Sequence, residues 1–217
     1  SFPELGWHIK GEMGGLWAHP IKLMDGFSAR LKTGEETVVL GGDGPDGESG
    51  TPADRFTNFP MANRHTWELK ALGLEVARWQ FVPDGSEGVL LEYTLHNKTP
   101  HPLTLTFEFR GYADLRPTWL GERTGMRDAR DRAVYDSTDL AWMVKDENNP
   151  WWVVLGTPRK PAGTRQMDSP YAGKGRGISL EYSLKIPASG TEVLRFALAG
   201  SSATEIEARN TYRNLLM

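Results

Sequence analysis

The sequence predicts an all-β domain, an antiparallel β-sandwich followed by a C-terminal helix. Many short segments alternate polar and apolar residues, turn residues recur between them, and no helical period appears before residue 201. With 217 residues the chain is long enough to bury a sizeable core as one domain. About ten strands in this pattern favour a sandwich over a parallel α/β sheet.

The first strands are predicted from alternation and from the turn residues that bound them. Pro100 and Pro102 separate two of these strands because proline cannot donate to a β-ladder. The residues between the second and third segments, 71–73, form a hairpin turn. The expected strands of this half cover residues 36–40, 64–70, 74–82, 88–97 and 103–110.

The second half of the chain has five more alternating segments and one long predicted loop. The loop, 158–177, contains Gly and Pro turn points and several cations, and Arg165, Lys174 and Arg176 can line a neighbouring groove. Its Gly173–Gly177 run lacks the Lys-Ser/Thr ending of a phosphate loop. The expected strands cover residues 132–135, 140–145, 151–156, 178–186 and 191–198.

The last residues change to a helical period. Ser202 or Thr204 can cap a helix, and Glu205 and Glu207 suit its first turn. The segment has no Gly or Pro stop signal and ends on apolar residues. We therefore expect a sandwich over residues 1–200 and the start of a linker helix over 201–217.

Composition limits the function. A net charge of −3 gives no electrostatic reason to expect nucleic acid or an anionic membrane as a partner. No apolar run approaches the length of a membrane span. The absence of cysteine excludes thiol catalysis and Cys-based zinc sites, and it fits a reducing cytoplasm, where we expect the protein to reside. Eight Trp residues suit either a core of large rings or platforms for stacking sugars.

No motif specifies a catalytic, metal or cofactor site. The acidic residues of loop 43–48 do not have calcium-loop spacing, so a solvated hairpin loop is favoured. None of the five His residues forms a recognisable metal pair, and no Gly-x-Ser-x-Gly elbow supports a serine hydrolase. We therefore assign no catalytic residue, no metal and no cofactor from the sequence.

Two regions are unusual enough to be candidate carbohydrate-binding or interface sites. Residues 6–27 combine Trp, His, Asp and several Gly, which indicates either an edge strand with glycine bulges or a backbone that approaches a ligand. Residues 112–122 follow a strand and are expected to form a charged corner in which Asp114 and Arg116 pair with each other or with a neighbour. The candidate residues are Trp7, His8, Trp17, His19, Asp25, Arg116 and Trp119.

Three tracts carry a family resemblance: GGLWAHPIKLMDGF at 14–27, HNKTPHPLTLTFEF at 96–109 and DLRPTWLGE at 114–122. Together they resemble the N-terminal β-sandwich of bacterial glycogen-debranching-enzyme-like glycoside hydrolases, the amylo-α-1,6-glucosidase and glucoamylase type. The resemblance implies a galactose-mutarotase-like β-supersandwich that precedes an (α/α)6-barrel. It also implies that the catalytic carboxylates belong to that barrel, so none is assigned to Glu12, Asp25, Asp114 or Glu122.

Three functions follow as hypotheses. The first is a non-catalytic N-terminal domain of an α-glucan-processing hydrolase, which packs on the catalytic barrel, shapes its cleft and contacts α-glucan oligosaccharides. The second is an independent carbohydrate-binding module. The third is a stand-alone mutarotase-like enzyme, which needs one His and one carboxylate to converge on the sugar. His65 or His96 could supply the imidazole and Glu68 or Glu92 the carboxylate, although nothing in their spacing favours this.

Overall fold

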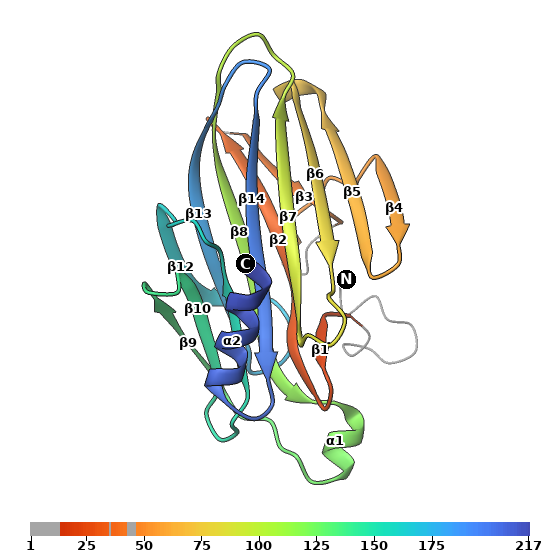
Figure 1. Cartoon of the computed structure of the whole chain (residues 1–217), viewed down its shortest axis with the longest axis vertical. Coiled ribbons are helices and arrows are strands. Elements are labelled where there is room, and N and C mark those ends of the chain that lie inside the picture. Colours follow the sequence, from red (N-terminus) through yellow and green to blue (C-terminus); the bar gives the residue numbers. More distant parts are fainter. Residues whose placement is uncertain (1–13, 35, 43–46) are drawn as a thin grey trace.

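The computed structural model describes residues 14–34, 36–42 and 47–217, and all its strands belong to two antiparallel sheets (Figure 1). The six-stranded sheet has the order β1-β2-β8-β13-β12, and β3 also pairs with β2. Its strands are β1 (Leu16–Ala18), β2 (Ile21–Thr33), β3 (Glu36–Leu40), β8 (Leu103–Pro117), β12 (Gly163–Asp168) and β13 (Arg176–Ile186). The prediction of an antiparallel sandwich is confirmed.

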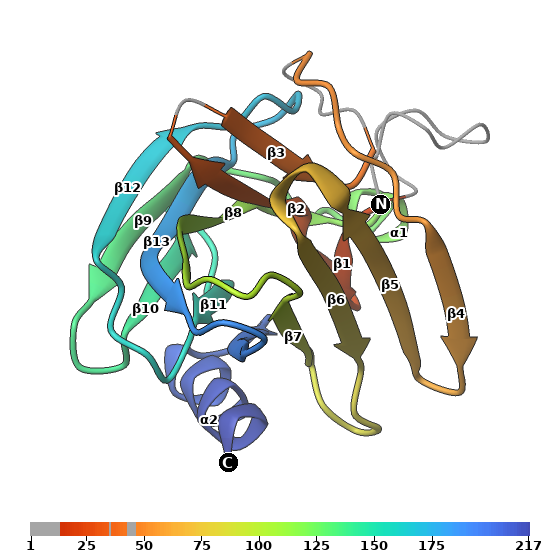
Figure 2. The ribbon, with the colours of Figure 1, turned by 90° about the horizontal axis from the view of Figure 1, so that it is seen from above.

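The eight-stranded sheet has the order β4-β5-β6-β7-β14-β11-β10-β9. Its strands are β4 (Arg55–Phe59), β5 (Ala62–Leu69), β6 (Leu74–Phe81), β7 (Gly88–Asn97), β9 (Asp131–Asp136), β10 (Ala141–Asp146), β11 (Trp152–Gly156) and β14 (Thr191–Ser201). In Figure 2, β4 ends the row that runs from β7 through β6 and β5.

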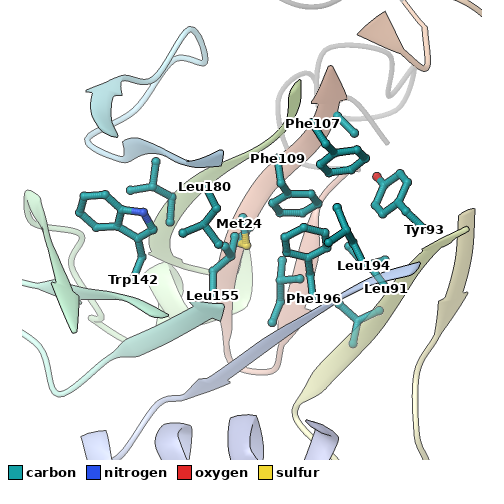
Figure 3. Close-up of a cluster of buried hydrophobic side chains, with 14 of the residues drawn as sticks. Met24, Leu91, Tyr93, Phe107, Phe109, Trp142, Leu155, Leu180, Leu194 and Phe196 are labelled. Atoms are coloured by element: carbon teal, nitrogen blue, oxygen red, sulfur yellow. The ribbon is translucent and has the colours of Figure 1, made fainter. Parts of the chain in front are cut away.

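Aromatic rings from both sheets fill the centre of the sandwich. Phe107 and Phe109 of β8 meet Tyr93 of β7 and Phe196 of β14 (Figure 3), and the Phe109 and Phe196 rings stack at 4.3 Å. All four side chains are at most 1% exposed. Alternation along each strand produces this core because every second residue points inward.

The C-terminal helix α2 (Glu205–Leu216) packs on the outer face of the eight-stranded sheet, against β14, β11 and β7 (Figure 1). Thr204 caps its start by accepting a hydrogen bond from the backbone N–H of Glu207. Tyr212 is buried and donates a hydrogen bond to the backbone oxygen of Asp139 at 2.9 Å. The predicted C-terminal helix is therefore confirmed. None of the helices in the described residues is long and apolar enough to cross a membrane.

Several expectations were wrong in detail. In the glycine-rich tract, β1 lies at the sheet edge with a register shift, as one of the two interpretations expected, whereas β2 is an inner strand that pairs with β8 on one side and with β1 and β3 on the other. The predicted loop 158–177 contains β12, which lacks apolar alternation and, among the described strands, pairs with β13 alone. β4 was not predicted because its polar sequence, RFTNF, carries no strong signal.

The region after β8 also differs from the expectation. The residues expected to form a charged corner continue β8 up to Pro117. A short helix, α1 (Trp119–Arg123), follows and is capped by Thr118. A further single turn, η2 (Lys70–Leu72), closes the predicted hairpin between β5 and β6, with Gly73 in the left-handed conformation.

Candidate functional site

A pocket of about 340 Å³ lies between the two sheets, where β2 and β3 face β5 and β6. Its wall includes part of the glycine-rich tract, because Gly15 and β2 residues from Met24 to Ser28 contribute to it. At Gly15, with φ of 104°, an added Cβ would lie 2.2 Å from the backbone oxygen of Met24, so only glycine allows this close approach. The polar or aromatic side chains that line the pocket are Phe27, Ser28, Glu48, His65, Trp67, Arg78, Gln80 and Tyr112.

Arg78 is the central charged group of the pocket. Its guanidinium lies 5.3 Å from the centre of the Phe27 ring and 5.7 Å from that of Trp67. The two rings fix its position, while Trp67 itself donates an indole N–H to the backbone oxygen of Thr51. The buried Nε of Arg78 has no hydrogen-bond acceptor within the described residues. An unsatisfied buried donor of this kind is uncommon, since nearly all buried polar groups are hydrogen-bonded.

His65 lies beside Arg78, with 3.0 Å between His65 Nδ1 and Arg78 Nη2. Burial and the nearby positive charge of Arg78 lower the pKa of His65 to about 4, so the imidazole is neutral at pH 7. Because a guanidinium only donates, Nδ1 must accept, and the proton of the neutral ring is on Nε2. The pocket therefore presents an imidazole N–H donor.

The described lining holds no acid–base pair for catalysis. Glu48 is its one carboxylate, and it forms an ion pair with Arg30. His65 is the one imidazole of this lining, and the Nδ1 atom of His65 accepts a hydrogen bond from Arg78. Within the described parts of the chain, no group of three or more His, Asp or Glu side chains is arranged to hold a metal ion.

Of the two histidines of the mutarotase hypothesis, His65 does not share a face with Glu68 or Glu92, whereas His96 does. His65 pairs across the sheet with Arg78, whereas His96 pairs with Glu75, three positions away on β6. Since successive residues point to opposite faces, His65 faces the inside of the sandwich and His96 the outside. Glu68, which pairs with Glu75, and Glu92 share the outer face with His96.

A second cluster surrounds Lys22 on β2 and brings together three of the predicted site residues. Lys22 Nζ lies 2.7 Å from Asp25 Oδ1 and 5.2 Å from the centre of the Trp17 ring. Arg116 Nη2 lies 3.9 Å from the same Asp25 oxygen. Lys22 and Asp25 are at most 1% exposed, whereas Trp17 and Arg116 reach the surface. Burial lowers the pKa of Lys22 despite its pairing with Asp25.

The remaining predicted residues are separate from this cluster. His19 is exposed in the turn between β1 and β2. Trp119 begins α1, and its side chain lies outside the described part of the structure. Trp7 and His8 also lie outside the described residues.

The predicted pairing of Asp114 with Arg116 is present, with 3.2 Å between Arg116 Nε and Asp114 Oδ2. Asp114 is 1% exposed, and neither of its oxygens accepts a hydrogen bond from the described residues. Burial, together with the negative charge of Asp25, raises the pKa of Asp114 to about 7. Burial likewise raises the pKa of Asp131, whose Oδ2 accepts the Leu115 N–H, to about 8.

Trp67, Arg78 and Gln80 were not predicted as site residues. A signal was nevertheless present, because the alternation of the predicted hairpin places Arg78 and Gln80 on the same face as Val76, which is an apolar core position. Polar residues on the inward face of a strand are uncommon unless they bind something.

Solved structures with the same fold are found at very low sequence identity. A bacterial glucoamylase solved with acarbose has a TM-score of 0.55 and 7% identity, over 90% of this chain and 29% of that chain. A galactose mutarotase-related enzyme from Lactobacillus acidophilus has a TM-score of 0.53 and 9% identity, over 85% and 84%. A candidate kojibiose phosphorylase from the human microbiome has a TM-score of 0.51 and 10% identity, over 87% and 24%.

These similarities define the class of fold: the chain is a galactose-mutarotase-like antiparallel β-sandwich. It spans about a quarter of the glucoamylase and of the candidate phosphorylase, and most of the mutarotase-related enzyme. No protein-family model and no curated protein matches the sequence. At these identities the similarity extends to the fold alone.

Proposed function

We propose that this chain is a non-catalytic, carbohydrate-binding domain of a larger α-glucan-processing glycoside hydrolase, which packs against the catalytic (α/α)6-barrel of that enzyme. The observation that carries the proposal is the pocket around Arg78, whose described lining combines aromatic rings and polar side chains but holds no pair of catalytic carboxylates. The similarity to parts of longer carbohydrate-active enzymes supports it.

The chemistry of the pocket suits a sugar ring. A pyranose has an apolar C–H face, which packs on aromatic side chains such as Phe27, and a rim of hydroxyl groups. A hydroxyl oxygen can accept from a terminal N–H of the Arg78 guanidinium and from Nε2–H of His65, while the Gln80 amide both donates and accepts. The volume of about 340 Å³ is at the small end of ligand pockets, which fits a single sugar unit.

The same pocket does not support glycoside hydrolysis. Hydrolysis with inversion needs one carboxyl group as acid and a second as base on opposite sides of the scissile bond. Glu48 is the one carboxylate of the described lining, and Arg30 neutralises it. Catalysis is therefore assigned to the partner barrel, and the domain contributes binding.

Calorimetric titration with maltoheptaose tests the proposal. We expect wild-type binding that weakens by about tenfold or more in His65→Ala, because a buried donor to the sugar is lost. His96→Ala is the matched control, since it removes the same side chain from the outer face of the same sheet. Gln80→Ala provides a second pocket variant. No heat with the wild type, or equal losses in His65→Ala and His96→Ala, would contradict the assignment.

A second assay separates binding from catalysis. The isolated domain should release no glucose from maltooligosaccharides or pullulan. Turnover that disappears in Glu48→Gln would contradict the non-catalytic role and place the acid in this pocket.

A stand-alone sugar epimerase is the second candidate, because the chain covers 84% of the mutarotase-related enzyme. The pocket counts against it, because its lining includes His65 but neither Glu68 nor Glu92, which lie on the opposite face of the sheet with His96. Measuring the interconversion of glucose anomers decides the matter, since a domain that only binds leaves the uncatalysed rate unchanged.

A further inference from the structure

The strand β4 is a free edge of the eight-stranded sheet. It pairs with β5 on one side, and no strand in the described residues pairs with its other side. Its register with β5 runs without interruption from Arg55 to Phe59. A straight edge strand of this kind presents a row of backbone N–H and C=O groups to solvent.

This edge lacks the features that normally prevent strands from pairing. It contains no Pro, no Lys and no bulge, and its one charged residue, Arg55, stands at its start. Phe56 is 59% exposed and Phe59 is 41% exposed. The opposite edge of the sheet differs, because β9 carries charges at Arg132 and Asp136. Exposed aromatic residues on an unprotected edge mark a pairing site.

We propose that β4 pairs antiparallel with β4 of a second copy of this chain, about a twofold axis at Thr57, and so forms a homodimer with one continuous sheet. In this register Arg55 lies opposite the partner's Phe59, and Phe56 lies opposite the partner's Asn58. A twofold interface must be self-complementary, because every contact between one residue and a second residue of the partner is repeated with the two copies exchanged.

The sequence of β4 is compatible with such a self-complementary interface, because its charges do not oppose one another. Reversed upon itself about Thr57, it places no charge opposite a like charge. Each Arg55 instead faces an aromatic ring, a favourable cross-strand pair. The pairing also covers Phe56 and Phe59, which are otherwise exposed. A second copy of the chain therefore fits this edge by its own sequence.

The dimer should be weak and dependent on concentration. Five-residue strands bury less than the roughly 800 Å² per partner that is typical of stable complexes. Sedimentation velocity from about 5 µM to about 500 µM should thus show a shift from monomer to dimer. A wild type that remains monomeric over this range, or that forms only larger oligomers, overturns the proposal.

Charge substitutions at the axis test the register. Thr57→Lys places two ammonium groups opposite each other, so we expect a monomer, while Val134→Lys on the other edge strand should leave dimerisation unchanged. Mixing Thr57→Lys with Thr57→Glu should restore a dimer that contains one copy of each.

Thermal melting tests whether each variant is folded. If Thr57→Lys fails to fold, Phe59→Lys provides a second interface variant. Folded Thr57→Lys or Phe59→Lys that dimerises like the wild type overturns the proposal. Folded Thr57→Lys and Thr57→Glu that stay monomeric when mixed overturn the twofold axis at Thr57.

Discussion

Replacing Asp114 by Asn should change how the stability of this domain depends on pH. The carboxyl group of Asp114 is 1% exposed, and its pKa is raised from 3.8 to about 7. The folded protein therefore holds a proton there that the unfolded chain loses above pH 4. The contribution of this protonated carboxyl group to the free energy of unfolding is fully present below about pH 4. It falls as the pH rises and is lost above about pH 7.

The magnitude follows from the difference between the two pKa values. A shift of that size corresponds to about 4 kcal/mol, a large part of the stability of a typical domain. Asn resembles the neutral acid in shape and carries no charge. We therefore expect the free energy of unfolding of Asp114→Asn to equal that of the wild type near pH 4. It should exceed the wild-type value by up to about 4 kcal/mol at pH 8.

Urea denaturation followed by tryptophan fluorescence between pH 4 and pH 8 measures this difference. The lowered pKa of His65 acts in the opposite direction between pH 4 and 6.5, but it cancels because both proteins contain it. Asp168→Asn is the matched control, since the Asp168 carboxylate is fully exposed and should shift stability by less than about 0.5 kcal/mol. A difference that does not vary with pH, or a less stable Asp114→Asn at pH 8, would refute the reasoning.

Three further changes probe the rest of the fold by urea denaturation. Asp139→Asn should destabilise by about 2 kcal/mol, less in high salt, because Asp139 binds Arg209 and Arg213 and so ties α2 to the sheet. Phe196→Ala should cost about 3–5 kcal/mol through a cavity in the aromatic core, and a loss below about 1 kcal/mol would argue against that packing. Glu108→Gln should destabilise at pH 7 but not near pH 2, since hydrogen bonds from Arg110 and Lys32 hold the pKa of Glu108 at about 2 despite its burial.

Local patterns predicted the strands whose apolar residues alternate strongly. They did not predict strands that form through backbone pairing with a neighbour and bury few apolar side chains. The segment 88–97 was predicted residue for residue, because its apolar positions alternate without interruption. β12 and β4 were missed because both lie at sheet edges and bury few side chains. The extension of β8 to Pro117 was missed because Asp114 and Arg116 suggested a turn, although Ala113 and Leu115 continue the buried alternation.

The candidate site was less predictable than the fold. Residues 6–27 were singled out from composition, and the pocket does use Gly15, Gly26 and Phe27 of this tract. The opposite wall comes from β5 and β6, and which residues face the tract depends on how the two sheets stack. A local pattern does not contain that information, since packing between sheets joins segments that are far apart in the chain, such as those of Phe27 and His65.

The position of Arg78 links the fold to its proposed role. A sandwich of this size would gain stability from an apolar residue at this inward position, because a charge taken out of water costs free energy. No carboxylate within the described residues pairs with Arg78, and two aromatic rings hold it in place. Violations of the usual core pattern are expected where function requires them. An arginine fixed by rings, with one donor unused beside a neutral imidazole, is suited to binding a neutral polyol rather than to proton transfer.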